Sequence, residues 1–229
     1  MKKLLAAALL FSGISSFSMD YRIGIGGTYS FYESQGEEKI TGGAGYVTIN
    51  AREIMGRVLF STGFDIHYGR VKSSLEGSKS EKFGLGNYHL KVGFNPFGES
   101  PSTFLSVVYS WDWLYGNVNR DFETGAHLIG LDLHTFIKGN KVTYEYGVGY
   151  HYVFHSYHYL DKTRSGINDF SYAIDARVGY TYELSPKVAY FINARGKYYS
   201  LAESKLNTPD FNRPKTEHVL MQLEVGLQF

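Results

Sequence analysis

Two Asp-x-His pairs are the residues of this sequence that could most directly do chemistry. Asp65 and His67 form one pair, and Asp132 and His134 form the other. An Asp can orient a nearby imidazole as a general base that activates water, as in many hydrolases. Apolar and polar residues alternate around both pairs, so the two members of each pair point to the same side of an extended strand. These four side chains are the candidate catalytic residues.

Histidines also raise the question of a metal site, which would need His and carboxylate ligands because the chain has no Cys. Along one strand His151 and His155 would lie about 13 Å apart, which is too far for both to bind one ion. We therefore expect no metal and no cofactor, and we expect hydrogen-bonded histidines in a polar interior. The histidines that share the inward parity are His67, His89, His134, His151, His155 and His218.

Charged residues of the same parity predict an ion network. A three-residue turn at "LSPKV" would place Leu184 opposite Val188 and Arg177 opposite Arg195. Like charges opposed across a ladder are unfavourable, so acidic groups from other strands, such as Asp132, are expected to approach them. The predicted members of this network are Asp112, Glu145, Asp175, Arg177, Arg195 and Lys197, with Asp175 opposite Lys197.

The elements that position these residues are strands, because apolar and polar side chains alternate through most of the chain. Short turns and longer polar connections also alternate, which predicts an up-and-down antiparallel β-barrel of ten strands. Eight strands are the alternative, since the strand and turn near 39–56 are poorly defined. The expected turns are 51–56, 95–101, 139–140 and 185–187, and the expected loops are 33–38, 72–82, 117–123, 157–168 and 200–216.

One turn permits a prediction of register. Gly139 and Asn140 in "KGNK" suit a two-residue hairpin with positive φ. That hairpin would pair Ile137 with Val142, and His134 with Glu145.

Aromatic residues decide which face of the barrel points outward. The chain holds 20 Tyr and 16 Phe, and many rings lie near the two ends of the apolar face, with Val, Ile and Leu between them. A soluble barrel buries its apolar face, whereas a membrane barrel exposes it between two aromatic belts. We therefore expect the apolar face to contact lipid and the polar face to line a lumen.

The N-terminal segment 1–18, "MKKLLAAALLFSGISSFS", predicts a signal peptide: two Lys precede a short apolar run and small residues. Residues 19–229 would then form one exported β-barrel domain. With 23 basic and 22 acidic residues, the chain shows no charge excess that would favour nucleic acid.

The C-terminal segment "HVLMQLEVGLQF" alternates and ends on an aromatic residue. It resembles the sorting signal of Gram-negative outer-membrane proteins, in which such a strand is read by the barrel assembly machinery. The resemblance implies an outer-membrane location, with outer-membrane lipid and the assembly machinery as partners. The residues that carry it are Leu223, Val225, Leu227 and Phe229.

The Asp-His pairs also resemble those of the omptins, which are ten-stranded outer-membrane proteases. The resemblance implies hydrolase activity at Asp65 and His67, but no adjacent Asp-Asp pair accompanies them. The sequence therefore favours a non-enzymatic outer-membrane barrel with a narrow or plugged charged lumen, acting in membrane stabilisation or in binding an unidentified surface ligand. A passive small-solute channel and an omptin-like hydrolase are the alternatives.

Overall fold

The computed structural model describes residues 19–34, 39–74, 79–98, 102–118, 120–160, 163–167, 169–205 and 215–229. The predicted signal peptide, 1–18, lies outside the described residues. Within them, no helix is long and apolar enough to cross a membrane. The strands are β1 (Asp20–Ser34), β2 (Lys39–Met55), β3 (Val58–Ser73), β4 (Glu81–Phe94), β5 (Ser102–Val118), β6 (Arg120–Lys138), β7 (Val142–Leu160), β8 (Thr163–Ile167), β9 (Tyr172–Ser185), β10 (Val188–Leu201), β11 (Ser204–Lys205) and β12 (Thr216–Gln228).

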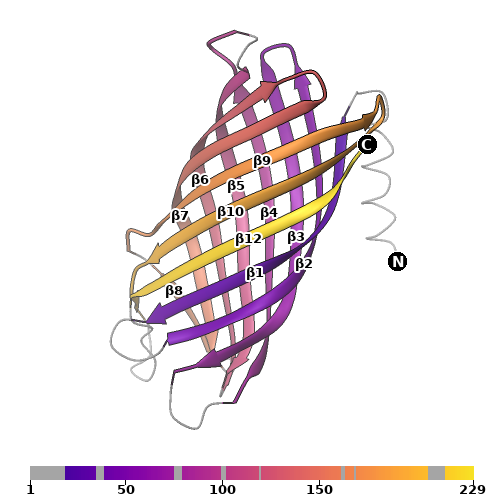
Figure 1. The fold of residues 1–229 in the computed structure, drawn as a ribbon. Helices are drawn as coiled ribbons and strands as arrows, with labels where there is room; N and C mark the ends of the chain where they lie inside the picture. Colours follow the sequence, from indigo (N-terminus) through magenta and orange to yellow (C-terminus); the bar gives the residue numbers. More distant parts are fainter. Residues whose placement is uncertain are drawn as a thin grey trace, which may run out of the picture.

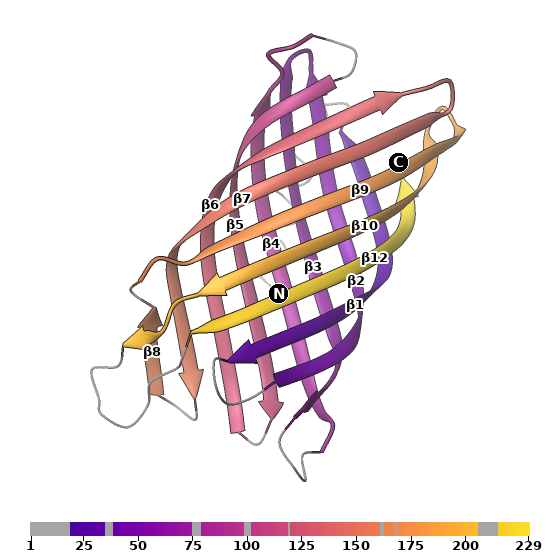
Figure 2. The same ribbon diagram turned by 60° about the vertical axis from the view of Figure 1, so that its left-hand side comes forward.

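Ten long strands close into one antiparallel barrel. Each pairs with the next along the chain, β7 pairs with β9, and β12 lies between β10 and β1 and closes the ring (Figure 1). The short strands β8 and β11 extend the sheet beside β7, at the end of the barrel opposite the chain's last residue (Figure 2). The prediction of ten strands is confirmed, and the alternative of eight is wrong.

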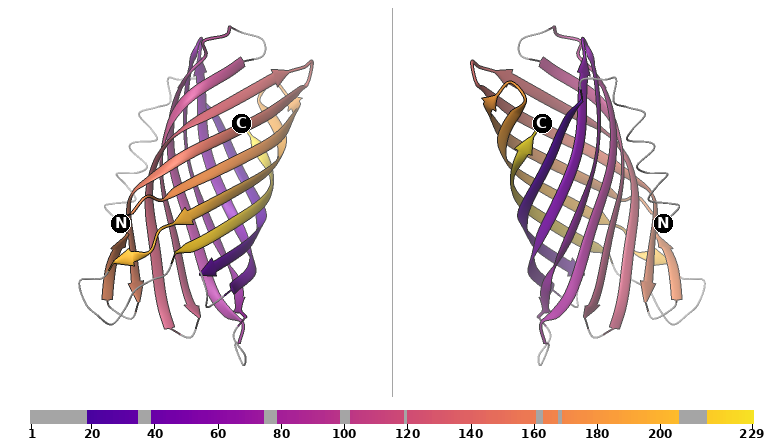
Figure 3. Two further views of the ribbon diagram at one scale, coloured as in Figure 1. Left: turned by 90° about the vertical axis from the view of Figure 1, so that its left-hand side faces the viewer. Right: turned by 90° about the vertical axis from the view of Figure 1, so that its right-hand side faces the viewer.

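The alternating apolar and polar side chains of the sequence lie on two different faces of the barrel, an outer face and an inner face that lines the lumen. Ile25 and Val47 point outward and are 63% and 52% exposed, whereas Arg22 and Thr28 point inward and are 6% and 4% exposed. Strands wrap the lumen on every side (Figure 3). A closed barrel satisfies the backbone hydrogen bonds of all its strands, which is what a lipid environment requires. The apolar face therefore points outward, as predicted.

Short turns gather at the end where the chain finishes, which we call the turn end; the other is the loop end. At the turn end, Met55 pairs with Val58 across the turn Gly56-Arg57. Gly56 has φ of 58° there, in the left-handed region that favours glycine. The opposite end differs from expectation: β5 reaches Val118 and β6 begins at Arg120, so most of the predicted loop 117–123 is strand.

Two predicted registers have different outcomes. Across β9 and β10, Arg177 lies opposite Arg195 as predicted, but an irregularity next to Val188 places that residue opposite Ser185 rather than Leu184.

Across β6 and β7, Ile137 pairs with Tyr144 instead of Val142, and His134 with Gly147 instead of Glu145. That prediction was wrong because a slip of two residues leaves every side chain on its own face, so the alternation fits both registers.

A β-bulge in β7 turns His155 to the outer face, so the predicted inward orientation of this residue was wrong. The β6–β7 register shifts between His127 and Leu128: Leu128 pairs with Val153, whereas His127 pairs with His155. The additional residue in β7 reverses the alternation beyond it. His155, predicted to face the lumen, is therefore exposed, and the neighbouring Ser156 is buried instead.

Candidate functional site in the barrel lumen

The lumen is filled by side chains in successive zones along the barrel axis. A lower ion network near the turn end and a central ion network lie between two groups of buried apolar residues. The apolar group at the turn end, Leu59, Phe104 and Phe136, is almost fully buried. The group toward the loop end is larger, and both are described after the ion networks.

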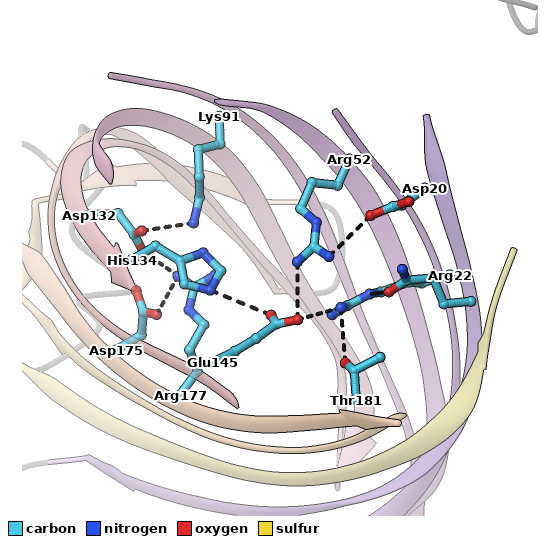
Figure 4. A network of polar contacts seen from close by, with 11 residues as sticks. Asp20, Arg22, Arg52, Lys91, Asp132, His134, Glu145, Asp175, Arg177 and Thr181 are labelled. Carbon is cyan, nitrogen blue, oxygen red and sulfur yellow. Dashed lines mark hydrogen bonds and ion pairs between the residues drawn. The ribbon is translucent and has the colours of Figure 1, made fainter. Parts of the chain in front are cut away.

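The lower network joins opposite walls of the barrel (Figure 4). Arg52 on β2 donates from Nη1 to Glu145 Oε1 on β7 at 3.0 Å, and four strands separate β2 from β7 in either direction around the ring. Arg22 also pairs with Glu145 and donates to Thr181 Oγ1 at 3.2 Å. Asp20 accepts from Arg52 Nη2 at 3.3 Å. One buried carboxylate thus holds two guanidinium groups from two other strands.

The central network begins at Asp132 on β6, whose side chain is fully buried. Lys91 Nζ on β4 lies 2.8 Å from Asp132 Oδ1, and Arg177 on β9 pairs with the other oxygen. Arg177 also donates to Asp175 Oδ1 at 3.1 Å. His151 Nε2 on β7 lies 2.5 Å from Asp175 Oδ2. Figure 4 shows Lys91 and Arg177 converging on Asp132.

The central network continues on the other side of the lumen. Lys197 Nζ on β10 lies 2.5 Å from Asp112 Oδ2 on β5, and Tyr199 donates to the same oxygen at 2.7 Å. Asn87 on β4 donates to the second oxygen of Asp112. Arg195 Nη1 lies 3.7 Å from Asp65 Oδ2. The structure thus brings together the residues that the sequence singled out for a lumen network, although Glu145 belongs to the lower network.

The candidate catalytic pairs do not form Asp-His dyads. His67 Nδ1 lies 2.7 Å from Thr28 Oγ1, and its ring stacks on Tyr46 at 4.5 Å, while Asp65 faces Arg195. Asp132 is engaged by Lys91 and Arg177, as described above. His134 Nε2 instead lies 3.5 Å from Glu145 Oε2.

Sequence reasoning missed the Asp-His pair that does form, His151 with Asp175. Both side chains are buried, at 3% and 2% exposure. Gly149, directly opposite Asp175 in the ladder, leaves the space that the pair occupies: a Cβ at Gly149 would lie 2.5 Å from Asp175 Oδ2 and 2.7 Å from His151 Nε2. The register of β7 against β9 would have revealed this pair, but the alternation does not define that register.

The loop half of the lumen contains a large group of buried apolar residues, which the predicted polar lining did not anticipate. Its buried residues, here called the apolar layer, come from strands all around the ring, and Phe83 and Leu128 are at most 1% exposed. The signal was present in the sequence as apolar residues on the inward parity near the loop ends. The apolar layer consists of Ile40, Ala44, Val71, Phe83, Leu85, Ala126, Leu128, Val153, Ala173, Tyr199, Leu201 and Leu220.

Metal ligation finds no support in the described part of the chain, where no group of three or more His, Cys, Asp or Glu is placed to hold an ion. His218 contacts Ser30, with Nε2 and Oγ 2.9 Å apart. His89 Nδ1 is buried and has no hydrogen-bond partner among the described residues.

The predicted assembly signal lies on the lipid face at the barrel seam. Leu223, Val225 and Leu227 are 58%, 45% and 42% exposed. The last residue, Phe229, exchanges two backbone hydrogen bonds with Tyr21, of 2.8 and 3.1 Å. The segment that resembles a sorting signal is therefore also the strand that closes the barrel.

Comparisons with known proteins agree with this architecture. No protein-family model matches the chain, and no curated protein matches it. Among solved structures, it is similar to the outer-membrane protease OmpT from Escherichia coli, with 10% identity over 92% of this chain and 96% of that one and a TM-score of 0.59. The translocator domain of the autotransporter NalP from Neisseria meningitidis gives 12% identity over 100% and 95% of the two chains, with a TM-score of 0.44.

The likeness to OmpT shows a shared fold. The chain is a small outer-membrane-type β-barrel of ten strands. Its apolar outer face, closed ladder and even strand number are the features by which such barrels reside in an outer membrane, and this chain resides there. In the lumen geometry described above, His67 contacts Thr28 and Asp65 faces Arg195, so these two residues do not form an Asp-His dyad.

Proposed function

We propose that this protein is a non-enzymatic outer-membrane barrel with a closed lumen, which serves membrane stabilisation or presents its loop end to a surface ligand. The observation that carries the proposal is the set of ion pairs that cross the lumen. Arg52 to Glu145 and Lys197 to Asp112 each join distant strands. Barrels of eight strands are just filled by side chains, and the ten strands here leave little more room.

The apolar layer supplies a second barrier. Buried Phe and Leu side chains from several strands converge on the loop-end side of the central network. A hydrophobic constriction in a channel excludes water and therefore ions, even where a narrow gap remains. The two barriers lie in series along the barrel axis. An ion that crosses the lumen from either end would therefore have to pass both.

Conductance of the refolded native protein in a planar lipid bilayer tests the proposal directly. We expect no stable conductance steps above the membrane baseline. Reproducible steps of one size from the native barrel would instead support the small-solute channel. A matched measurement on a porin of known conductance, inserted by the same procedure, verifies that the assay detects an open lumen.

A further inference from the structure

Three basic side chains lie close together on the outer face of the barrel at the loop end. Arg70 and Lys72 follow Tyr68 along β3 with the same outward parity, and both are exposed. Lys82 of β4 lies directly opposite Arg70 in the ladder and is exposed as well. Like charges opposed across a ladder repel each other unless an anion compensates them. We call Arg70, Lys72 and Lys82 the basic patch.

No carboxylate among the described residues pairs with a member of the basic patch. Lys39 Nζ of β2 lies 3.2 Å from Glu33 Oε1 of β1, so the neighbouring acid on this face is already engaged. Glu81 is next to Lys82 in the chain, but it lies opposite the buried Val71 and shares its inward parity. The repulsion between the facing cations is therefore not compensated within the described part of the protein.

The basic patch lies just beyond the aromatic belt of the outer face. Tyr68 and Tyr115 flank Gly84 there, and their rings are 64% and 51% exposed. Exposed Tyr rings mark the membrane–water interface of such barrels. Arg70 and Lys82 are two residues nearer the loop end than Tyr68 and Gly84, which is about 7 Å along the strands. The patch therefore lies beside the lipid headgroups and faces sideways into them.

We infer that the basic patch is a docking surface for the phosphate of an outer-leaflet lipid. Opposed side chains start about 5 Å apart, so Arg70 and Lys82 can reach one phosphate together, the guanidinium donating to two of its oxygens. A Cβ at Gly84 would meet only the backbone oxygen of His67, at 3.5 Å. The outer surface is therefore low between the two Tyr rings, which leaves room for a headgroup. The inference does not depend on a closed lumen, because the patch lies outside the barrel.

The test uses the refolded barrel in detergent, with the phosphorylated glycolipid lipid A as the probe. Native mass spectrometry counts the bound lipid, and the unfolding temperature is measured with and without it. Lipid A from which the phosphates have been removed keeps its acyl chains and is the matched control ligand. Inorganic phosphate tests whether a free anion suffices. We expect saturable binding and a higher unfolding temperature with lipid A, and neither with the other two ligands.

Arg70→Gln with Lys82→Gln is the deciding variant. Both native side chains are exposed, and their replacement removes a repulsion, so the barrel should assemble. We expect the affinity for lipid A to fall about tenfold or more, because each basic side chain at an anionic surface contributes to binding. Lys138→Gln with Lys141→Gln is the matched control: it removes two exposed cations at the turn end, and it should bind lipid A like the native protein.

Lys82→Glu provides a second readout if the double variant fails to assemble. It places a carboxylate opposite Arg70, so the pair would neutralise itself. We expect a higher unfolding temperature than that of the native barrel without lipid, and no further rise with lipid A. Equal binding of lipid A by the native barrel and the deciding variant would overturn the inference. Equal binding of the dephosphorylated lipid would assign the contact to acyl chains, and equal stabilisation by inorganic phosphate would assign it to a free anion; either result would also overturn it.

Discussion

Arg177 and Arg195 lie directly opposite each other across the β9–β10 ladder, an arrangement that is unfavourable for two like charges without compensation. Acidic groups of other strands provide that compensation. Arg177 pairs with Asp132 of β6, and Arg195 lies 3.7 Å from Asp65 of β3. The two guanidinium groups are thus drawn apart toward different walls of the barrel.

The first prediction concerns the stability that Arg177 provides. In Arg177→Ser, Asp132 would keep only Lys91, and its carboxylate would remain fully buried. Removing one partner from a buried ion pair typically costs about 3–5 kcal/mol, and the remaining lysine should hold the loss to the lower end of that range. The measurement is the temperature at which the folded form, detected by its distinct gel migration without boiling, converts to the unfolded form.

Arg195→Ser is the matched comparison for that experiment. It removes the same side chain from the facing position, but its longer contact with Asp65 should contribute less. We expect a clearly smaller fall in unfolding temperature. A larger fall for Arg195→Ser than for Arg177→Ser would contradict the assignment of Asp132 as the centre of the network.

The second prediction tests whether two barriers act in series. Arg177→Ser with Arg195→Ser opens the central network but leaves the apolar layer, so conductance in a planar bilayer should stay close to that of the native barrel. Phe83→Ser with Leu128→Ser opens only the apolar layer, where both native side chains are at most 1% exposed. All four substitutions together should give more conductance than either pair, with the Arg52–Glu145 pair of the lower network still limiting it. Full conductance from either pair alone would show that a single barrier closes the lumen.

The third prediction concerns the glycine beside the His151–Asp175 pair. A Cβ at Gly149 would lie 2.5 Å from Asp175 Oδ2, which real contacts do not allow. Gly149→Ala should therefore displace the pair and destabilise the barrel by about 1–3 kcal/mol, as overpacking typically does. The unfolding temperature measures this loss.

Gly45→Ala serves as the control for the glycine experiment. Gly45 lies on the outward face. The nearest atom to a Cβ added there would be 4.0 Å away. The methyl group should be tolerated there. Equal destabilisation by both substitutions would point to a general effect on strand glycines and not to the buried pair.

The strand count, the membrane face and the position of Arg177 opposite Arg195 could be read from the sequence because each depends on local alternation or on one short turn. His155 could not be placed, since a single additional residue in β7 reverses the alternation beyond it. The role of Arg52 was missed for a related reason: the turn after β2 was not located, so the inward register of its last residues was undefined.

Cross-lumen contacts were only partly predictable. The approach of acids toward Arg177 follows from electrostatics, because a buried pair of like charges requires compensation. The partner of Arg52 is Glu145, on the opposite wall of the ring, and that pairing depends on how far the strands are staggered when the barrel closes. Alternation carries no information about stagger, since slips of two residues leave the faces unchanged.

The fourth prediction concerns the C-terminal strand, which we propose is read by the assembly machinery and then closes the barrel. Deleting Phe229 removes both of its backbone hydrogen bonds to Tyr21. Leu227→Asp places a charge on the lipid face, at a cost of about 1–4 kcal/mol depending on depth. Both changes should reduce the amount of heat-modifiable barrel in outer membranes severalfold.

Gln228→Ala is the control: its side chain faces inward and accepts from Arg22 Nε at 2.8 Å, so its loss should affect stability mildly and assembly little. If all three variants assemble to the native level, the terminal residues are not the assembly signal.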